Sequence, residues 1–325
     1  MPLLLDERDV RSVLTMPDLI DSMRAALADY SGGRTQQPLR TVLELGEQRS
    51  FFGIMPASLA DPRAVGTKLV TVFPSNHDRG LPSHLATIVL LDPDTGALLA
   101  LLDGRYITEA RTAAVSAVSA DLLARPDAGT LAIIGTGVQA RSHLEALACV
   151  RPLTEVRVWS PTESHRSAFV KDASRHGIHV RAAASARDAV DDADLIAVAT
   201  SSTTPVLESA WVREGAHICA VGACRPTHRE LETALVARSR LFVDSAIGAL
   251  AEAGDVVLAI QDGAVTAAHI AGELGAVVSG VVPGRQNPRQ ITLFKSLGMA
   301  VEDIAAANLA YTRAQTRGVG TELAM

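Results

Sequence analysis

Two glycines and an alanine, Gly135, Gly137 and Ala140, have the spacing GxGxxA in the segment TLAIIGTGVQARSHLEAL. The largely apolar residues 130–134 before them predict a buried strand, and the residues from Val138 onward predict a helix. Backbone amides at the start of a helix can bind a phosphate group where no side chain blocks the approach, and glycines leave the approach open. A second strand, expected at 155–159, follows about twenty residues later, as in dinucleotide-binding folds. The pattern therefore favours a nucleotide cofactor over a plain glycine turn.

The residues after that second strand bear on the choice between NAD and NADP. NAD-binding domains usually place an acid there for the ribose hydroxyls, whereas this chain has Ser160, Pro161 and Thr162. Without a carboxylate a 2'-phosphate is accepted more easily, and Ser160, Thr162 and Arg166 are candidate donors to it. The same residues would also serve as an ordinary loop and helix cap. The sequence favours NADP(H) as the cofactor, with NAD(H) as the alternative.

Three cationic residues are candidates for binding an anion. Arg111 follows Thr108, an expected helix N-cap, so we expect its guanidinium in a first turn, where the helix dipole opposes a cation unless an anion binds nearby. Lys68 lies in the apolar strand AVGTKLVTVF, where an inward ammonium needs a partner and an outward one would indicate an edge strand. Arg40, which starts a strand after Pro38, carries a weaker signal. Together these cations predict a site for a small anion.

Other polar residues have plainer interpretations. His84 in LPSHLATIV fits a satisfied structural histidine. Cys224 follows a strand at the carboxyl edge, where it is expected to line a pocket rather than act as a nucleophile, because no base is near it in the sequence. Asp303 opens the last helix, where a carboxylate is favoured as a cap.

Composition limits the class of protein. The chain has 325 residues, 48% of them hydrophobic, a net charge of -6 and no dense basic run, which argues against a nucleic-acid partner. Acids at residues 6 and 7 and breaks in the later apolar runs argue against an export signal and a membrane span. The cysteines, Cys149, Cys219 and Cys224, are widely spaced and predict neither a disulfide framework nor a metal site. We therefore expect a cytoplasmic protein with a small-molecule ligand and no metal.

The expected elements form two groups. A helix at 16–30 precedes strands at 40–45, 64–73, 85–92 and 97–102, which predicts an antiparallel or mixed sheet. After an alanine-rich helix at 107–124, strands alternate with helices through 130–134, 155–159, 179–182, 194–200, 216–221 and 240–243. The last helix, from Met299, is expected to pack back on the first group. We thus predict an α/β protein: a Rossmann-like doubly wound sheet at 116–298, inserted into an α+β substrate and dimerisation domain at 1–115 and 299–325.

Six strings, TKLVTVFPSN, GLPSH, TEARTAA, GTGVQA, AVGACRP and FKSLGMAVED, resemble the ornithine cyclodeaminase and mu-crystallin family, in the same order from about residue 38 to residue 311. The resemblance implies a homodimer in which three cations hold the carboxylate of an amino or imino acid beside a nicotinamide: Arg40, Lys68 and Arg111. It also implies cofactor contacts at Ser83, His84, Arg111, Val138, Gln139, Thr200 and Val221. With the residues inferred above from the glycine turn and the second strand, Gly135, Gly137, Ser160 and Thr162, these form the expected cofactor site.

One departure from the family pattern narrows the expected reaction. Cyclodeaminases carry an aspartate in a GDxPGKxEL-like segment that handles the proton of the substrate amine, whereas this chain reads GACRPTHREL with Cys224 at that position. A neutral thiol cannot supply that charge or base. The segment is similar to the mu-crystallin branch, which is known for NADPH-dependent ketimine reduction, although Pro161 replaces an arginine of that branch.

We therefore expect NAD(P)H-dependent reduction of cyclic imino acids, 1-pyrroline-2-carboxylate or 1-piperideine-2-carboxylate, to proline or pipecolate, with Lys68 and Arg111 as the catalytic residues and Cys224 beside the substrate. Three alternatives stay open at this point. They are an ornithine or lysine cyclodeaminase, an alanine or opine dehydrogenase, and a catalytically silent protein that binds NADPH or another small ligand.

Overall fold

The structure is a computed structural model that describes residues 1–46, 50–175 and 177–324. The chain divides into two compact units. The first comprises Met1–Arg111 and Gly298–Met325, and the second comprises Thr112–Leu297. The long helix α3 (Gly104–Leu123) contributes residues to both units.

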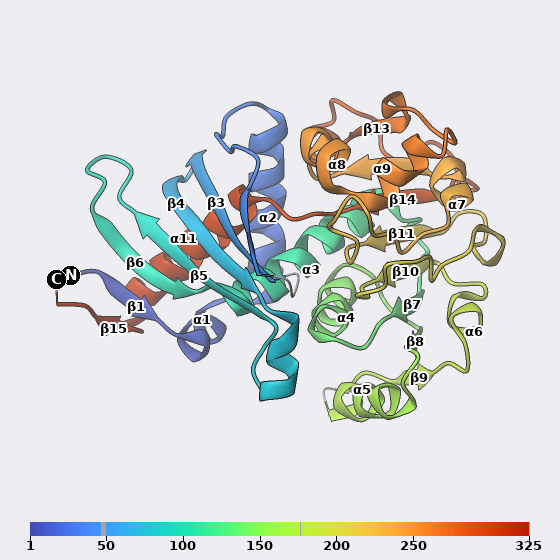
Figure 1. Cartoon of the computed structure of the whole chain (residues 1–325), viewed down its shortest axis with the longest axis horizontal. Helices are drawn as coiled ribbons and strands as arrows, with labels where there is room; N and C mark the ends of the chain where they lie inside the picture. The colour runs from blue at the N-terminus through green and yellow to red at the C-terminus, as the bar shows by residue number, and fades with distance from the viewer. Residues whose placement is uncertain (47–49, 176, 325) are drawn as a thin grey trace. The chain divides into compact units, whose positions relative to one another are not determined.

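The first unit is built on a mixed sheet with the strand order β15-β1-β6-β5-β4-β3-β2. The strands are β1 (Leu3–Leu5), β2 (Thr41–Leu45), β3 (Ser50–Ala60), β4 (Arg63–Val72), β5 (His84–Leu91), β6 (Leu98–Asp103) and β15 (Thr321–Glu322). Strands β2 to β6 pair antiparallel, whereas β1 lies parallel to β6. Because β1 pairs with β15, the two ends of the chain lie side by side (Figure 1).

Helices cover one face of this sheet. They are α1 (Glu7–Val13), α2 (Met16–Ser31) and α11 (Ala300–Arg317), with the 3-10 helix η1 (Pro74–Arg79) in the connection between β4 and β5. The red helix α11 runs across β3, β4 and β5 (Figure 1). Small residues allow this close packing, since a Cβ on Gly66 of β4 would lie 3.0 Å from the Ile304 side chain. The sheet residues that face α11, including Lys68, are consequently buried.

The second unit is a parallel sheet with the order β13-β12-β14-β11-β10-β7-β8-β9. Its strands are β7 (Thr130–Ile134), β8 (Glu155–Trp159), β9 (Val180–Ala182), β10 (Leu195–Val198), β11 (His217–Ala220), β12 (Arg240–Val243), β13 (Ile270–Glu273) and β14 (Thr292–Lys295). Its helices are α4 (Val138–Val150), α5 (Glu163–Arg175), α6 (Ala186–Val190), α7 (Thr233–Arg238), α8 (Ala246–Glu252), α9 (Gly254–Gln261) and α10 (Leu274–Val278), with short 3-10 turns η2 (Ser209–Trp211) and η3 (Ala267–His269).

Successive residues of β7 face two separate cores. Leu131 and Ile133 pack with α4, α5 and the end of α3, whereas Ala132 and Ile134 pack with α6 to α9 on the other face. A strand covered on both faces is apolar along its whole length, as the sequence of β7 indicated. The arrangement is a doubly wound α/β sheet, and the predicted fold class is confirmed.

Five strands, β1, β3, β13, β14 and β15, were not predicted, and α3 begins earlier than expected. Strand β3, which lies between β2 and β4, contains Gly53 and Pro56, which normally argue against a strand. Strands β13 and β14 have four residues each, too few for a periodic signal. Helix α3 starts at Gly104 rather than near Thr108, whose hydroxyl donates to the Gly104 carbonyl at 2.7 Å from inside the helix. Among the described residues, the structure contains no helix with the length and apolar character of a membrane span.

Candidate active site

Lys68 is the central charge of a buried cluster in the first unit. Strand β4 lies between β3 and β5, and its side chains point alternately to the two faces of the sheet. Lys68 points to the face that the helices cover. The side chain is 2% exposed, and its ammonium lies 2.6 Å from the carboxylate of Asp303 and 3.4 Å from the Thr108 hydroxyl. The alternative of an outward-pointing lysine on an edge strand is therefore wrong.

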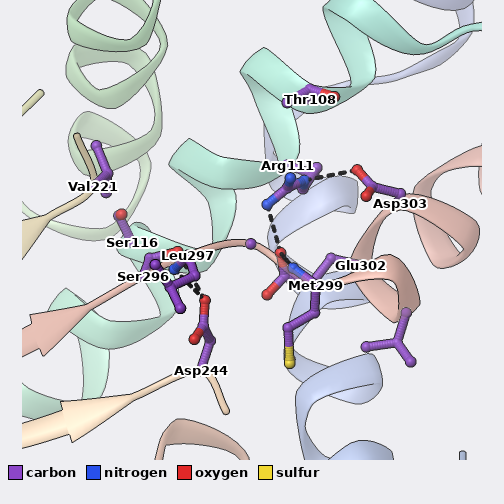
Figure 2. A network of polar contacts seen from close by, with 12 residues as sticks. Thr108, Arg111, Ser116, Val221, Asp244, Ser296, Leu297, Met299, Glu302 and Asp303 are labelled. Carbon is purple, nitrogen blue, oxygen red and sulfur yellow. Dashed lines mark hydrogen bonds and ion pairs between the residues drawn. The ribbon is translucent and has the colours of Figure 1, made fainter. Parts of the chain in front are cut away.

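Arg111 joins the same cluster from α3. Its Nε donates to Oδ1 of Asp303 at 2.9 Å, and a terminal nitrogen donates to Oε2 of Glu302 at 2.7 Å (Figure 2). Both acids belong to the first turn of α11 and are fully buried. Gly298, just before this helix, has a φ of +76°, and a Cβ there would collide with the Arg111 guanidinium. The glycine is thus required by both its backbone conformation and the close approach of Arg111.

Arg40 completes the set of cations. It is half-buried, and its guanidinium donates to the Gly298 carbonyl at 3.0 Å. The three predicted cations, Arg40, Lys68 and Arg111, are therefore brought together around Gly298 and the start of α11. The cluster therefore combines three cationic side chains with the acids Glu302 and Asp303. Cationic side chains are the groups that bind the carboxylate of a small molecule.

The environment alters the acid-base chemistry of the cluster. Burial lowers the pKa of Lys68 to about 8, with Arg111 and Arg40 acting in the same direction and Asp303 opposing them. Burial would raise the pKa of Asp303, but Arg111 and Lys68 hold it below its ordinary value. Burial and the neighbouring Lys68 and Arg111 also lower the pKa of His84 to about 4. At neutral pH the cluster therefore holds a carboxylate, a mostly protonated lysine and a neutral histidine.

Two sequence interpretations in this unit need correction. Arg111 is the eighth residue of α3 rather than part of its first turn, so the helix dipole does not explain it. Asp303 is not a cap, because it forms ion pairs with Lys68 and Arg111. The N-cap of α11 is Met299, whose N–H donates to Glu302 at 3.1 Å. Sequence reasoning missed Glu302 and Asp303 as partners, although two buried cations require nearby acids.

The glycine turn of the second unit has the shape that a dinucleotide needs. Gly135 has a φ of +116°, and a Cβ there would collide with the carbonyl oxygen of Ala199. Gly137 caps α4 without a side chain, and a Cβ on it would meet no atom within 4 Å. Ala140 is fully buried in the core beneath the helix. An anion can therefore approach the first amides of a thirteen-residue helix, and these residues fit a dinucleotide diphosphate.

The other expected cofactor contacts in this unit follow strand ends. Ser160 after β8 is buried, and its hydroxyl accepts from Thr136 at 3.2 Å, while Arg166 donates to the Ser160 carbonyl at 2.5 Å. Thr162 is exposed. Beyond this strand the expected contacts lie at the start of α4 and after β10 and β11: Val138 (exposed), Gln139 and Thr200 (half-buried), and Val221 (buried).

Cys224 and Ser83 are both exposed. The Cys224 thiol lies 3.4 Å from the Val221 carbonyl, at the carboxyl edge of the sheet in the second unit. Ser83 lies in the first unit, next to His84, and its carbonyl accepts from the Phe73 N–H at 2.8 Å. Within the part of the chain that the structure describes, no group of three or more His, Cys, Asp or Glu side chains could hold a metal ion.

The sequence profile of the ornithine cyclodeaminase/mu-crystallin family matches residues 2–318. The chain belongs to this family. It is 45% identical over 296 residues to the ketimine reductase mu-crystallin of Mus musculus, covering 90% of this chain and 91% of that protein.

Two solved structures that cover nearly the whole chain are also closely similar to it. The Delta(1)-pyrroline-2-carboxylate reductase of Thermococcus litoralis, solved with NADH and L-proline, superposes with a TM-score of 0.96 at 41% identity and covers 99% of this chain and 100% of that one. An archaeal alanine dehydrogenase dimer with bound NAD superposes with a TM-score of 0.95 at 32% identity, covering 100% of this chain and 99% of that one.

Proposed function

We propose that this protein is an oxidoreductase that reduces cyclic imino acids, 1-pyrroline-2-carboxylate or 1-piperideine-2-carboxylate, to proline or pipecolate. The observation that carries the proposal is the gathering of three cations, the buried Lys68 and Arg111 and the half-buried Arg40, at the start of α11. Two relatives that match nearly the whole chain bear the names of imine reductases, and one of them was solved with NADH and proline. A small monocarboxylate is the anion that such a cluster would bind.

The cluster contributes position and charge to the reaction. Lys68 and Arg111 hold the substrate carboxylate, and their own positions are fixed by Asp303 and Glu302. A preorganised positive field of this kind favours an anion without reorganisation during the reaction. The nicotinamide cofactor, when bound, supplies the hydride that reduces the imine carbon.

The imine nitrogen also needs a proton. Lys68 holds one on Nζ at neutral pH, where its lowered pKa of about 8 makes release easier than from an ordinary lysine. A carboxylate bound beside the ammonium favours the charged form, so Lys68 is protonated when the substrate binds. We assign Lys68 as the residue that holds this proton.

Cys224 argues against amine elimination as the main reaction. The thiol is exposed at the carboxyl edge, where cyclodeaminases of the family pattern carry an aspartate. Without that carboxylate, the chain has no equivalent base at this position. The reductase therefore has the stronger support, and the cyclodeaminase becomes an outcome of the test.

We further propose that NADPH is preferred over NADH. The end of β8 presents Ser160 in place of an acid, and the Arg166 guanidinium is held there by its 2.5 Å bond to the Ser160 carbonyl. A cation at this point suits a 2'-phosphate. Arg166→Ala should raise the KM for NADPH by about tenfold and leave the KM for NADH nearly unchanged, because one charge-assisted contact is worth roughly 1.5 kcal/mol. Equal effects on both cofactors would contradict this preference.

We also propose a homodimer formed through the first unit. Strand β2 is the edge of its sheet, and it exposes apolar side chains at Val42, Leu43 and Leu45. An exposed apolar edge strand is a common site of association, and a second copy of this chain would cover it. The similar archaeal alanine dehydrogenase is a dimer.

A cytoplasmic location is the last part of the proposal. All three cysteines lie in the described part of the chain, and none of them forms a disulfide. Cysteine use of this kind is typical of a reducing compartment.

The direct test is NAD(P)H oxidation with the two cyclic imines, followed by product analysis. We expect stoichiometric proline or pipecolate, and loss of turnover by at least about a hundredfold in Arg111→Met, because truncation of a buried charged contact costs about 3 kcal/mol or more. Ammonia release from ornithine with no net cofactor change would overturn the reductase. Tight NADPH binding with no turnover on imines and keto acids would indicate a silent binding protein instead.

A further inference from the structure

Glu230 is a buried acid that the proposed reaction does not use. It lies in the connection between β11 and α7 and has no exposed surface. Oε1 accepts from the N–H and the hydroxyl of Thr200, both at 2.7 Å. Oε2 accepts from the N–H groups of Gly222 at 2.7 Å and Ala223 at 3.0 Å. One carboxylate thus ties the loop after β10 to the loop after β11.

The loops after β10 and β11 pack closely against each other. A Cβ on Gly222 would collide with the Thr200 carbonyl and with Oε1 of Glu230, so only glycine fits between them. The backbone of Glu230 is fixed as well, because its carbonyl accepts from Val206 and Leu207 at 2.8 and 3.1 Å. The carboxylate therefore ties Thr200 to Gly222 and Ala223, the residues directly after Val221.

Charged groups from two neighbouring elements support Glu230. Oδ1 of Asp255 in α9 accepts from the N–H groups of Glu230 and Leu231 at 2.8 and 3.0 Å. The Lys295 ammonium at the end of β14 lies 3.0 Å from Oδ2 of Asp255 and attracts both acids. The Cys224 thiol also interacts with Lys295. This arrangement places a buried ammonium and two acids behind the cofactor-lining strand ends.

We propose that Glu230 is a positioning residue for the cofactor: its carboxylate holds the loops of Thr200 and Val221 at the separation that the nicotinamide half of the dinucleotide requires, and protonation releases them. The inference rests on the proposed function, because it takes Thr200 and Val221 as cofactor contacts. A carboxylate offers acceptors to all four donors, whereas a protonated carboxyl would direct an O–H toward one of the N–H groups. Protonation therefore breaks at least one of the ties.

The pH at which this happens is near neutrality. Burial raises the pKa of Glu230 to about 7, with Asp255 acting in the same direction and Lys295 and the Thr200 donors opposing it. Binding that needs the ionised form weakens as pH falls through this value. Between pH 8 and pH 6 the dissociation constant for NAD(P)H should rise by about tenfold, since the ionised fraction falls by about that factor.

The test measures NAD(P)H binding to the full-length protein by nicotinamide fluorescence, from about pH 5.5 to 8.5, in wild type, Glu230→Gln and Glu232→Gln. Glu232 is a matched control, because it is a half-buried glutamate of the same segment that accepts one N–H, from Ser209 at 2.7 Å. We expect Glu230→Gln to raise the dissociation constant at pH 8 by about tenfold and to abolish its pH dependence, because an amide nitrogen then faces an N–H. Glu232→Gln should match wild type at every pH.

Kinetics provide a readout that general damage would not mimic. At saturating cofactor, kcat of Glu230→Gln should stay within about threefold of wild type while the cofactor KM rises. Wild-type binding that is constant from pH 6 to pH 8, or a Glu230→Gln affinity within twofold of wild type, would overturn the inference while leaving the proposed reductase intact. The wild-type profile alone decides the question if the variant does not fold. Absence of dinucleotide binding at any pH would instead overturn both proposals.

Discussion

Replacing Asp303 with asparagine tests whether the buried charges control the chemistry. The substitution keeps the shape of the side chain and removes the negative charge 2.6 Å from the Lys68 ammonium and 2.9 Å from Nε of Arg111. Asp303 is the acid that opposes the lowering of the Lys68 pKa by burial, Arg111 and Arg40. In the variant, that pKa should therefore fall below its wild-type value of about 8.

The size of the effect follows from the titration of Lys68. An opposite charge at this distance shifts a pKa by about 1–3 units. Lys68 is protonated below its pKa and neutral above it, so a lower pKa removes the ammonium at a lower pH. At pH 7.5, the protonated fraction falls by about threefold for a one-unit shift and by about 25-fold for a two-unit shift.

The assay is kcat/KM for 1-pyrroline-2-carboxylate with NADPH, measured from about pH 5.5 to 9.5. Wild type should lose activity as pH rises through about 8, and Asp303→Asn should lose it at least one unit lower, with partial recovery near pH 6. Asp18→Asn is the control, because Asp18 pairs with Arg313 at 2.6 Å on the surface of the same unit. That variant should keep the wild-type profile.

The substitution also affects stability, so folding must be checked. Removing one partner of a buried ion pair destabilises a protein by about 3–5 kcal/mol, and the assay temperature must stay below the lowered Tm. Lys68→Arg gives an independent check, because a guanidinium does not titrate in this range and the loss near pH 8 should disappear from any residual activity. An alkaline limb that is identical in wild type and Asp303→Asn would refute the assignment of Lys68.

Three further predictions follow from other contacts. Gly298→Ala should reduce kcat/KM by at least about tenfold, because a Cβ at this position would displace Arg111. Gly318→Ala is the control, since Gly318 has a φ of +64° and no atom lies within 4 Å of its Cβ position. It should lower the free energy of unfolding by about 1 kcal/mol and leave activity unchanged. Val42→Lys places a charge on the exposed edge strand β2 and should convert dimer to monomer in light scattering; an unchanged mass would refute the edge-strand interface. Dialysis against EDTA should leave turnover unchanged, since no group of three or more His, Cys, Asp or Glu among the described residues could hold a metal ion. Loss of activity on dialysis that only an added metal ion restores would contradict the expectation of a metal-free enzyme.

The glycine turn and the strand-helix alternation predicted the parallel sheet, because each depends on local sequence. Residues 130–134 form β7 and the helix begins at Val138, as the GxGxxA spacing predicted. The strands that were not predicted depend on tertiary contacts. Strand β3 tolerates Pro56 because its neighbours β2 and β4 hold the rest of the strand, and β14 is recognisable only by its place between β11 and β12.

The acids of the site could not be assigned from local sequence, since their partners lie about 190 or more residues away. Sequence reasoning identified Lys68 and Arg111 as anomalous cations and inferred a missing anion. The structure shows that Asp303 and Glu302 supply two negative charges within the protein itself. These two acids hold Lys68 and Arg111 in place, and Arg40 is the third cation at the same point, where it donates to the Gly298 carbonyl. Arg40→Met should therefore weaken substrate binding as strongly as a change at Arg111, although its sequence signal was the weakest of the three. A substrate KM within twofold of wild type in that variant would contradict the assignment of Arg40 to the carboxylate site.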